Sequence, residues 1–187
     1  KEEADKTFTS NKNGIPAYMQ KYYKMASDKR GSIQPPMDVY KRYLDYVLAS
    51  WGRDVKVWEL LNEPGLGGTP AKVYIDYLKE TYKTVKAFDK NAPVLGNGVT
   101  GDFGMNVIKW CESLNEADPD YEKYLDGIAF HPYGGSLDYQ KGNYFLYSKV
   151  ISDIRSKLKY KKPLWNTECF YITNSRKPQR EWYINLS

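Results

Sequence analysis

Hydrophobic positions along this chain follow two rhythms, one with the period of a helix and one with the short apolar runs of buried strands. Between Met37 and Ser50, apolar side chains return every three or four residues, which predicts a helix with one buried face. The same spacing predicts helices from Thr69, as an N-cap, to Phe88, from Met105 to Leu114 and from Tyr144 to Leu158. A last helix is expected to begin near Gln179.

Short apolar runs lie between these helices and predict four strands. Two of them span residues 55–62 and 92–99, and the other two lie within residues 124–135 and 162–170. Helices that alternate with strands are typical of parallel strands whose connections return over the sheet. The pattern therefore predicts an α/β fold, either a doubly wound sheet or a barrel.

The residues that follow the strands distinguish these two architectures. No strand is followed by a glycine-rich phosphate-binding loop, because the stretch GLGGTP after the first strand lacks the lysine and the spacing. In a (β/α) barrel the active site is built at the C-terminal ends of the strands. Polar and acidic residues stand at those ends here, which favours a barrel: Asn62, Glu63, Asn97, His131, Tyr133, Asn166 and Glu168.

Two of the strands finish in a glutamate, Glu63 and Glu168. Parallel strands of one barrel would bring both carboxylates together over its top. Such a pair suits glycoside hydrolysis, in which one carboxyl group protonates the leaving sugar and the other attacks or activates water. A separation near ~5 Å between the two groups gives retention of configuration, and one of ~6.5–9.5 Å gives inversion.

Two neighbours of these glutamates are expected to stand apart from the site. Glu59 shares a strand face with Glu63 but lies four residues back, roughly 13 Å deeper at the rise of a strand. We therefore expect Glu59 to be a paired structural carboxylate beneath the site. Trp165 has the opposite parity from Glu168, which predicts that it packs behind the strand.

Three motifs of this chain resemble the active-site strands of retaining glycoside hydrolases of clan A, whose fold is the (β/α)8 TIM barrel. The stretch WELLNEPG resembles the fourth-strand motif, AFHPYG the sixth and PLWNTE the seventh. Their order and the helix-sized gaps between them also match, in a style similar to families five and thirty-nine. The resemblance covers residues 37–171. It implies a hydrolase that cleaves a β-glycosidic bond of a poly- or oligosaccharide by double displacement.

The resemblance also implies a role for each matched residue. Glu63 would be the general acid/base and Glu168 the nucleophile. Asn62 would bind the 2-hydroxyl group of the sugar at the cleavage point. His131 and Tyr133 would line the same pocket, with Tyr133 donating a hydrogen bond to Glu168.

Each chemical role has a structural alternative. These alternatives are a carboxylate that caps the next helix for Glu63, an exposed strand-end residue for Glu168 and a satisfied core residue for His131. The alternative to an enzyme is a non-catalytic carbohydrate-binding or degenerate pseudo-glycosidase domain. It is motivated by the strands that the matched region lacks.

The motifs correspond to strands four to seven of the eight-stranded barrel, so residues 1–187 are expected to form a single, partial TIM-barrel catalytic domain. A whole barrel usually needs ~250 residues. The favoured explanation is that the chain is an excerpt of a longer enzyme. The alternatives are that further polypeptide completes the barrel or that the chain is a degenerate copy.

Composition narrows the classes of partner. The net charge is +5, and lysines and arginines are interspersed with acidic residues rather than gathered in a basic block, which argues against a nucleic-acid partner. No apolar run approaches the ~20 residues of a membrane span. The 18 tyrosines and five tryptophans fit either amphipathic packing or platforms that stack on sugar rings or bases.

No metal or cofactor is expected, since two carboxylates suffice for the reaction. Cys111 and Cys169 lack CxxC spacing, so they are expected to be free buried thiols rather than metal ligands or a disulfide. The expected partner is the carbohydrate substrate. The first residues, KEEADKTFTS, show no signal peptide, but the resemblance to polysaccharide-degrading enzymes implies a secreted, cell-surface or periplasmic protein.

Overall fold

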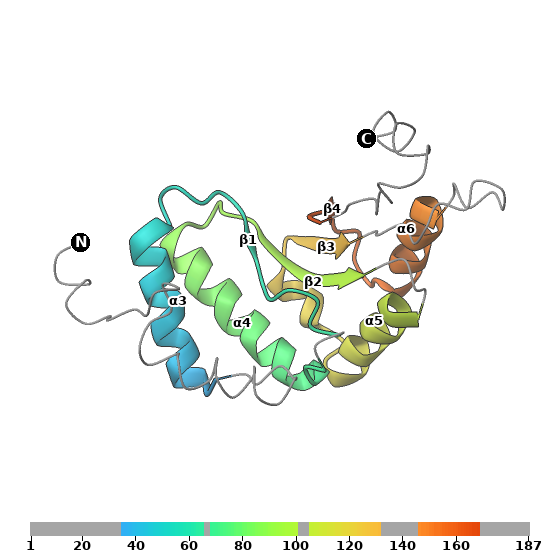
Figure 1. The fold of residues 1–187 in the computed structure, drawn as a ribbon, viewed down its shortest axis with the longest axis horizontal. Coiled ribbons are helices and arrows are strands. Elements are labelled where there is room, and N and C mark those ends of the chain that lie inside the picture. Colours follow the sequence, from blue (N-terminus) through green and yellow to red (C-terminus); the bar gives the residue numbers. More distant parts are fainter. Residues whose placement is uncertain (1–34, 66–67, 101–104, 132–145, 169–187) are drawn as a thin grey trace, which may run out of the picture.

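The computed structural model describes residues 35–65, 68–100, 105–131 and 146–168 (Figure 1). Helices and strands alternate along these residues, as predicted. In chain order the elements are α3 (Met37–Trp51), β1 (Trp58–Glu59), α4 (Ala71–Phe88), β2 (Val94–Thr100), α5 (Met105–Ala117), η1 (Tyr121–Tyr124), β3 (Gly127–His131), α6 (Leu146–Lys157) and β4 (Leu164–Asn166). The helix predicted near Gln179 lies outside the described residues.

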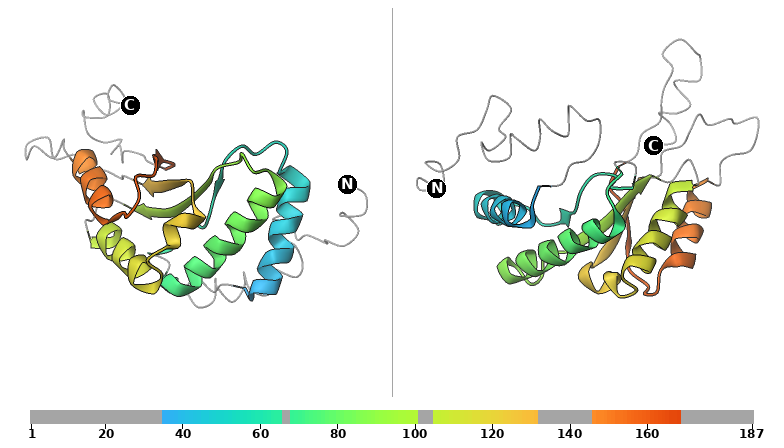
Figure 2. Two further views of the ribbon diagram at one scale, coloured as in Figure 1. Left: turned by 180° about the vertical axis from the view of Figure 1, so that it is seen from behind. Right: turned by 90° about the horizontal axis from the view of Figure 1, so that it is seen from below.

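The four strands form one parallel sheet in the order β1-β2-β3-β4. A helix follows each of the first three strands and leads back to the next one. Figure 2 shows these helices gathered on one side of the sheet. The sheet therefore has one face covered by helices and an opposite face that none of the described helices covers.

The core lies between the helices and the covered face of the sheet. Each helix presents a stripe of apolar side chains, as expected for helices that pack against a sheet. Tyr74 and Leu78 of α4, Leu114 of α5 and Ile154 of α6 are fully buried together with Ile128 of β3. This apolar layer holds the strands in place from behind, so that the polar residues at the strand ends have a rigid support.

Several tyrosines belong to this core rather than to a binding surface. Tyr40, Tyr74, Tyr77 and Tyr121 are all buried. The hydroxyl groups of Tyr40 and Thr81 lie 2.5 Å apart in a hydrogen bond, and burial raises the pKa of Tyr40 to about 12. For these four residues, amphipathic packing is the correct interpretation of the high tyrosine content.

The predicted α/β fold with a parallel sheet is confirmed. The described strands form an open sheet of four, so the closed eight-stranded barrel stays a prediction. Cys111 is a free buried thiol, as predicted, and burial raises its pKa to about 12. Cys169 lies outside the described residues. Within the described ranges, no helix has the length and apolar content to cross a bilayer.

Candidate active site

The chain turns away from the sheet directly after β1. Leu61 and Glu63 have φ angles of 56° and 45°, in the left-handed region that strands do not use. Pro64 and Gly65, both common turn residues, come next. The strand predicted over residues 55–62 therefore ends at Glu59, and its predicted length is wrong.

Gly98 of β2 makes room for this turn. A Cβ atom at this position would lie 3.0 Å from the carbonyl oxygen of Leu61 and 3.1 Å from Oε1 of Glu59. The residue also has a φ angle of 39°, which glycine tolerates far better than other residues. The absence of a side chain at Gly98 thus allows Glu59 and the turn to approach β2 closely.

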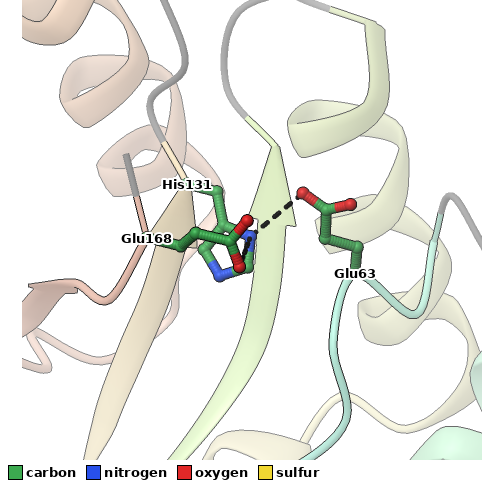
Figure 3. A group of neighbouring side chains, drawn as sticks. All are labelled: Glu63, His131 and Glu168. Carbon is green, nitrogen blue, oxygen red and sulfur yellow. Dashed lines mark hydrogen bonds and ion pairs between the residues drawn. The ribbon is translucent and has the colours of Figure 1, made fainter. Parts of the chain in front are cut away.

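His131, the last residue of β3, lies at the centre of the site (Figure 3). Its side chain is only 2% exposed, and three carboxylates from other segments surround it. Nδ1 is 3.0 Å from Oε1 of Glu63, within hydrogen-bond range, and 3.9 Å from Oε2 of Glu168. Nε2 faces Oε1 of Glu59 at 3.6 Å.

Glu63 and Glu168 converge, as their positions at the ends of parallel strands predicted. Their nearest donor atoms and that of His131 all lie within 4.8 Å of one another. Glu63 has a side chain 20% exposed, and Glu168, two residues beyond β4, is 46% exposed. The nearest oxygens of the two carboxylates are therefore closer than the ~6.5–9.5 Å between carboxyl groups that leaves room for a water molecule in inverting glycosidases.

The predicted place of Glu59 is wrong. It was expected roughly 13 Å below Glu63 on a continuous strand, but both carboxylates contact the same imidazole ring of His131. The physical reason is the left-handed backbone at Leu61 and Glu63, which brings the chain back instead of extending it. Glu59 therefore belongs to the site.

A further contact links Glu59 to the segment that carries Glu168. The hydroxyl group of Thr167 donates a hydrogen bond of 3.2 Å to Oε1 of Glu59. Thr167 directly precedes Glu168, and its backbone N–H lies 3.4 Å from the carbonyl oxygen of Phe130 in β3. The end of β4 is thus tied both to Glu59 and to the strand that carries His131.

Trp165 does not lie behind the sheet, contrary to its predicted parity. It pairs with Ala129, and its indole ring covers Gly127, where an added Cβ would lie 2.7 Å from the ring. Gly127, Ala129 and His131 alternate to the same face of β3, so Trp165 lies on the face that carries His131. Its side chain is 38% exposed there.

Asn97 also differs from its prediction as a strand-end residue of the site. It has a φ angle of 80°, at an irregularity of the ladder between β2 and β3. Its backbone N–H donates to the Tyr74 hydroxyl at 2.6 Å, and its side-chain amide donates to the Tyr121 hydroxyl at 3.4 Å. Asn97 therefore faces the helices. Burial raises the pKa of both tyrosines.

The remaining predicted site residues have different outcomes. Asn62 is exposed and lies next to Glu63 in the turn after β1. None of the described hydrogen bonds or ion pairs joins Asn62 to His131 or to the carboxylates around it. Tyr133 lies outside the described residues. The roles of both in substrate binding stay predictions.

Glu63, His131 and Glu168 also offer two oxygens and one nitrogen, a donor set that divalent transition metals accept. The contact between Nδ1 of His131 and Oε1 of Glu63 already joins two of these three atoms, so a cation would have to replace it. A hydrogen-bonded acid and imidazole suit proton transfer. The expectation that the protein uses no metal stays a prediction.

Glu59 is the residue that sequence reasoning missed. The prediction of a continuous strand places Glu59 far below Glu63, whereas the residues between them form a turn. The signal was present in Pro64 and Gly65, which indicate a reversal of the chain rather than further strand. Nothing in the sequence, however, indicates that Leu61 and Glu63 take left-handed angles.

Comparisons with known proteins were made on both sequence and structure. No protein-family model matches the chain, and no curated protein matches it. Solved structures with a similar arrangement include a GH39 β-xylosidase from Caulobacter crescentus, at 20% identity and a TM-score of 0.46, and a GH39 enzyme from Xanthomonas axonopodis pv. citri, at 20% and 0.45. Each match covers 76% of this chain and 30% of the other.

A xyloglucanase of GH family 44 from Paenibacillus polymyxa is also similar, at 19% identity and a TM-score of 0.34. That match covers 50% of this chain and 25% of the other. The chain thus spans about a third or less of the length of these glycoside hydrolases. At such identities and TM-scores, the likeness does not establish a shared activity.

Proposed function

We propose that this chain carries the two catalytic carboxylates of a retaining glycoside hydrolase that cleaves β-linked poly- or oligosaccharides. The observation that carries the proposal is the convergence of Glu63 and Glu168, whose nearest oxygens lie within 4.8 Å although they follow β1 and β4, the two outer strands of the described sheet. Two carboxylates that approach this closely suit the double displacement of retaining enzymes, in which both act on one anomeric carbon.

In the first step, the carboxylate of Glu168 attacks the anomeric carbon while the carboxyl group of Glu63 gives its proton to the leaving oxygen. The C–O bond to the leaving sugar breaks, and an ester bond forms between the remaining sugar and Glu168. In the second step, Glu63 takes a proton from water. The resulting hydroxide attacks the anomeric carbon and releases Glu168.

The environment of the two glutamates supports this division of roles. Glu63 is the less exposed of the pair and is hydrogen-bonded to the buried ring of His131, a partner that exchanges protons readily. Glu168 is nearly half exposed on the face of the sheet that carries no described helix, where a substrate has access.

Further strands are part of the proposal. Among the described strands, β1 and β4 each pair with only one neighbour, which leaves two open edges of a parallel sheet. We propose that further polypeptide continues the sheet from these edges into a barrel and supplies the rest of the sugar-binding pocket. The proposed activity is that of the assembled domain.

Azide rescue tests the proposal. With an activated aryl β-glycoside, Glu168→Gly should be inactive in buffer and regain turnover in azide, with a glycosyl azide of inverted configuration as the product. Glu63→Ala should keep its first step with good leaving groups, and azide should then yield a product of retained configuration. Glu116→Ala, at an exposed position of α5, is the matched control and should behave like the wild type.

Two results would contradict the proposal. One is full activity of both Glu63→Ala and Glu168→Gly. The other is binding of oligosaccharides in calorimetry without any turnover by the wild-type protein, which would favour the non-catalytic carbohydrate-binding alternative.

A further inference from the structure

We propose that Glu59 is a positioning residue, which sets the protonated nitrogen of His131 and thereby keeps the acid proton on Glu63. The inference rests on the proposed function for its consequence in catalysis. Its structural part, the control of the imidazole by Glu59, stands on contacts alone and can be measured without any substrate.

The first observation is that the two nitrogens of one buried ring face different carboxylates. Nδ1 lies 3.0 Å from Glu63, whereas Nε2 lies 3.6 Å from Glu59. A neutral imidazole carries its N–H proton on only one of these nitrogens. The other nitrogen is then an acceptor, and its partner has to donate the hydrogen bond. The choice of nitrogen therefore decides which group of the pair formed by His131 and Glu63 is the donor.

Glu59 favours the form in which Nε2 carries the proton. An ionised carboxylate opposite Nε2 attracts that N–H group, although 3.6 Å is longer than a formed hydrogen bond. Nδ1 is then left with a lone pair, and a protonated Glu63 donates to it. Glu63 is held as a carboxylic acid, which is the form that protonates a leaving group.

Glu168 exerts the opposite influence. Its Oε2 lies 3.9 Å from Nδ1 and attracts a proton to that nitrogen, where the N–H would donate to an ionised Glu63. Glu59 and Glu168 thus compete for the proton of one ring from its two sides. Without Glu59, the described contact that attracts a proton to Nε2 is lost. We then expect the proton to move to Nδ1, where Glu63 becomes the acceptor and can no longer act as an acid.

The second observation is that Glu59 is itself held in place. The Thr167 hydroxyl donates to the same Oε1 atom that faces His131, and Gly98 leaves the space that this carboxylate fills. Glu59 thereby connects the ends of β1, β3 and β4, which carry the acid, the imidazole and the nucleophile. A carboxylate that only balanced a surface charge would need neither the space at Gly98 nor the hydrogen bond from Thr167.

The chain offers an unusually direct test, because His131 is its only histidine. Protein labelled with ¹⁵N-histidine and freed of any affinity tag shows the two ring nitrogens of this one residue. In the wild type at pH 7, we expect chemical shifts of a neutral ring protonated at Nε2. A ring protonated at Nδ1, or an imidazolium, would overturn the proposal.

Variants separate the influence of Glu59 from general damage. Glu59→Ala should move the ring toward protonation at Nδ1, and Glu59→Gln should restore the wild-type pattern, because its amide oxygen still accepts from Nε2. Thr167→Val should give an intermediate shift, since it releases the Glu59 carboxylate without removing it. Glu116→Ala is the control for loss of an exposed carboxylate and should change nothing.

Activity provides a separate readout. Glu59→Ala should lower kcat about 10- to 100-fold for glycosides with poor leaving groups, a typical loss for a supporting residue. It should affect activated aryl glycosides much less, because these need little proton donation. Glu59→Gln should recover most of the loss.

The possible failures are distinguishable. If the assembled wild-type domain hydrolyses no β-glycoside, the proposed function fails, whereas the nitrogen shifts still decide the role of Glu59. If Glu59→Ala leaves the ring unchanged in a folded protein, the role of Glu59 fails and the proposed function does not. If Glu59→Ala does not fold, the wild-type spectrum and the spectrum of Thr167→Val decide whether Glu59 controls the protonation of His131.

Discussion

Two regions of this molecule hold carboxylates in opposite ways. Glu122 in η1 is fully buried, and its two oxygens accept hydrogen bonds of 2.7 and 2.9 Å from the backbone N–H groups of Lys159 and Tyr160. At the strand ends, Glu59, Glu63 and Glu168 instead approach the single imidazole ring of His131.

The difference distinguishes a structural carboxylate from the carboxylates that we propose to be reactive. Fixed backbone donors give Glu122 one stable arrangement, in which it ties the segment after α6 to η1. Three acidic side chains around one imidazole repel one another when ionised. The few protons of the group can be distributed among them in several ways. Such crowding costs stability, and proteins tolerate it mainly where the movement of a proton is useful.

The largest expected effect comes from the crowded region. Glu168→Gln removes the proposed nucleophile and its carboxylate while keeping the shape of the side chain. We expect kcat to fall by about 10⁴-fold or more, as for the loss of other covalent nucleophiles, while the thermal unfolding midpoint stays the same or rises. Initial rates together with calorimetry check both parts. A large fall in the midpoint would place Glu168 in the same structural class as Glu122.

Glu122→Ala should show the reverse pattern. Two part-buried backbone N–H groups lose their acceptors, so we expect the free energy of unfolding to fall by about 1–3 kcal/mol. Urea denaturation measures this change. Below the new unfolding midpoint, kcat should be close to that of the wild type, because none of the described contacts joins Glu122 to the residues around His131. A stability loss near zero would show that the segment after α6 is held by other contacts.

A pair of glycine substitutions tests the space beneath Glu59. Gly98→Ala introduces a Cβ close to both Leu61 and Glu59 at a positive φ angle, and should cost about 1–3 kcal/mol together with part of the activity. Gly68→Ala is the matched control, because its φ angle is 72° but no atom lies within 4 Å of the added Cβ. It should cost only about 1 kcal/mol and no activity. Equal effects of the two substitutions would show that strain, not the displacement of Glu59, explains the loss.

The smallest expected effect lies near Glu122, on the surface. Hydrogen bonds from Lys159 and Lys123 lower the pKa of Asp120 to about 2, below the ordinary value of 3.8. The stabilisation is therefore present above the pKa of the unfolded chain, near pH 4, and is lost as the pH falls toward 2.

Asp120→Asn should accordingly lower the unfolding midpoint slightly at pH 7 and leave it unchanged at pH 2. The effect is small because these side chains are exposed to solvent. Calorimetry across this pH range checks the sign, with Asp45→Asn on α3 as an exposed control. A loss that grows toward low pH would contradict the assignment.

The layered fold could be predicted from the sequence because its signal is local. The periodic residues of α3, such as Leu44 and Leu48, are buried as their spacing indicates, and Val94 and Ile128 mark strands that lie under helices. Prediction failed where the backbone leaves regular structure. Periodicity carries no information on the left-handed angles of Leu61 and Asn97, and these two positions explain the misplacement of Glu59 and of Asn97 itself.

The site could be predicted only in part, for a related reason. Glu63 and Glu168 each follow a strand of one parallel sheet, so their convergence at the same edge of the sheet could be expected from the sequence. The contacts of His131 depend instead on angles and side-chain rotations over three separate segments. No linear pattern relates Thr167 to Glu59, which lie 108 residues apart and meet in one hydrogen bond.

The turn between Glu59 and Glu63 also restricts which insertions, deletions and substitutions this segment can accept in evolution. Both acidic groups reach one ring only because three intervening residues form a single compact loop closed against Gly98. Inserting or deleting a residue in this loop would move one of the two carboxylates away from His131, whereas many substitutions would not. We therefore expect homologues to keep three residues between these two glutamates, whereas the identity of the three residues can vary.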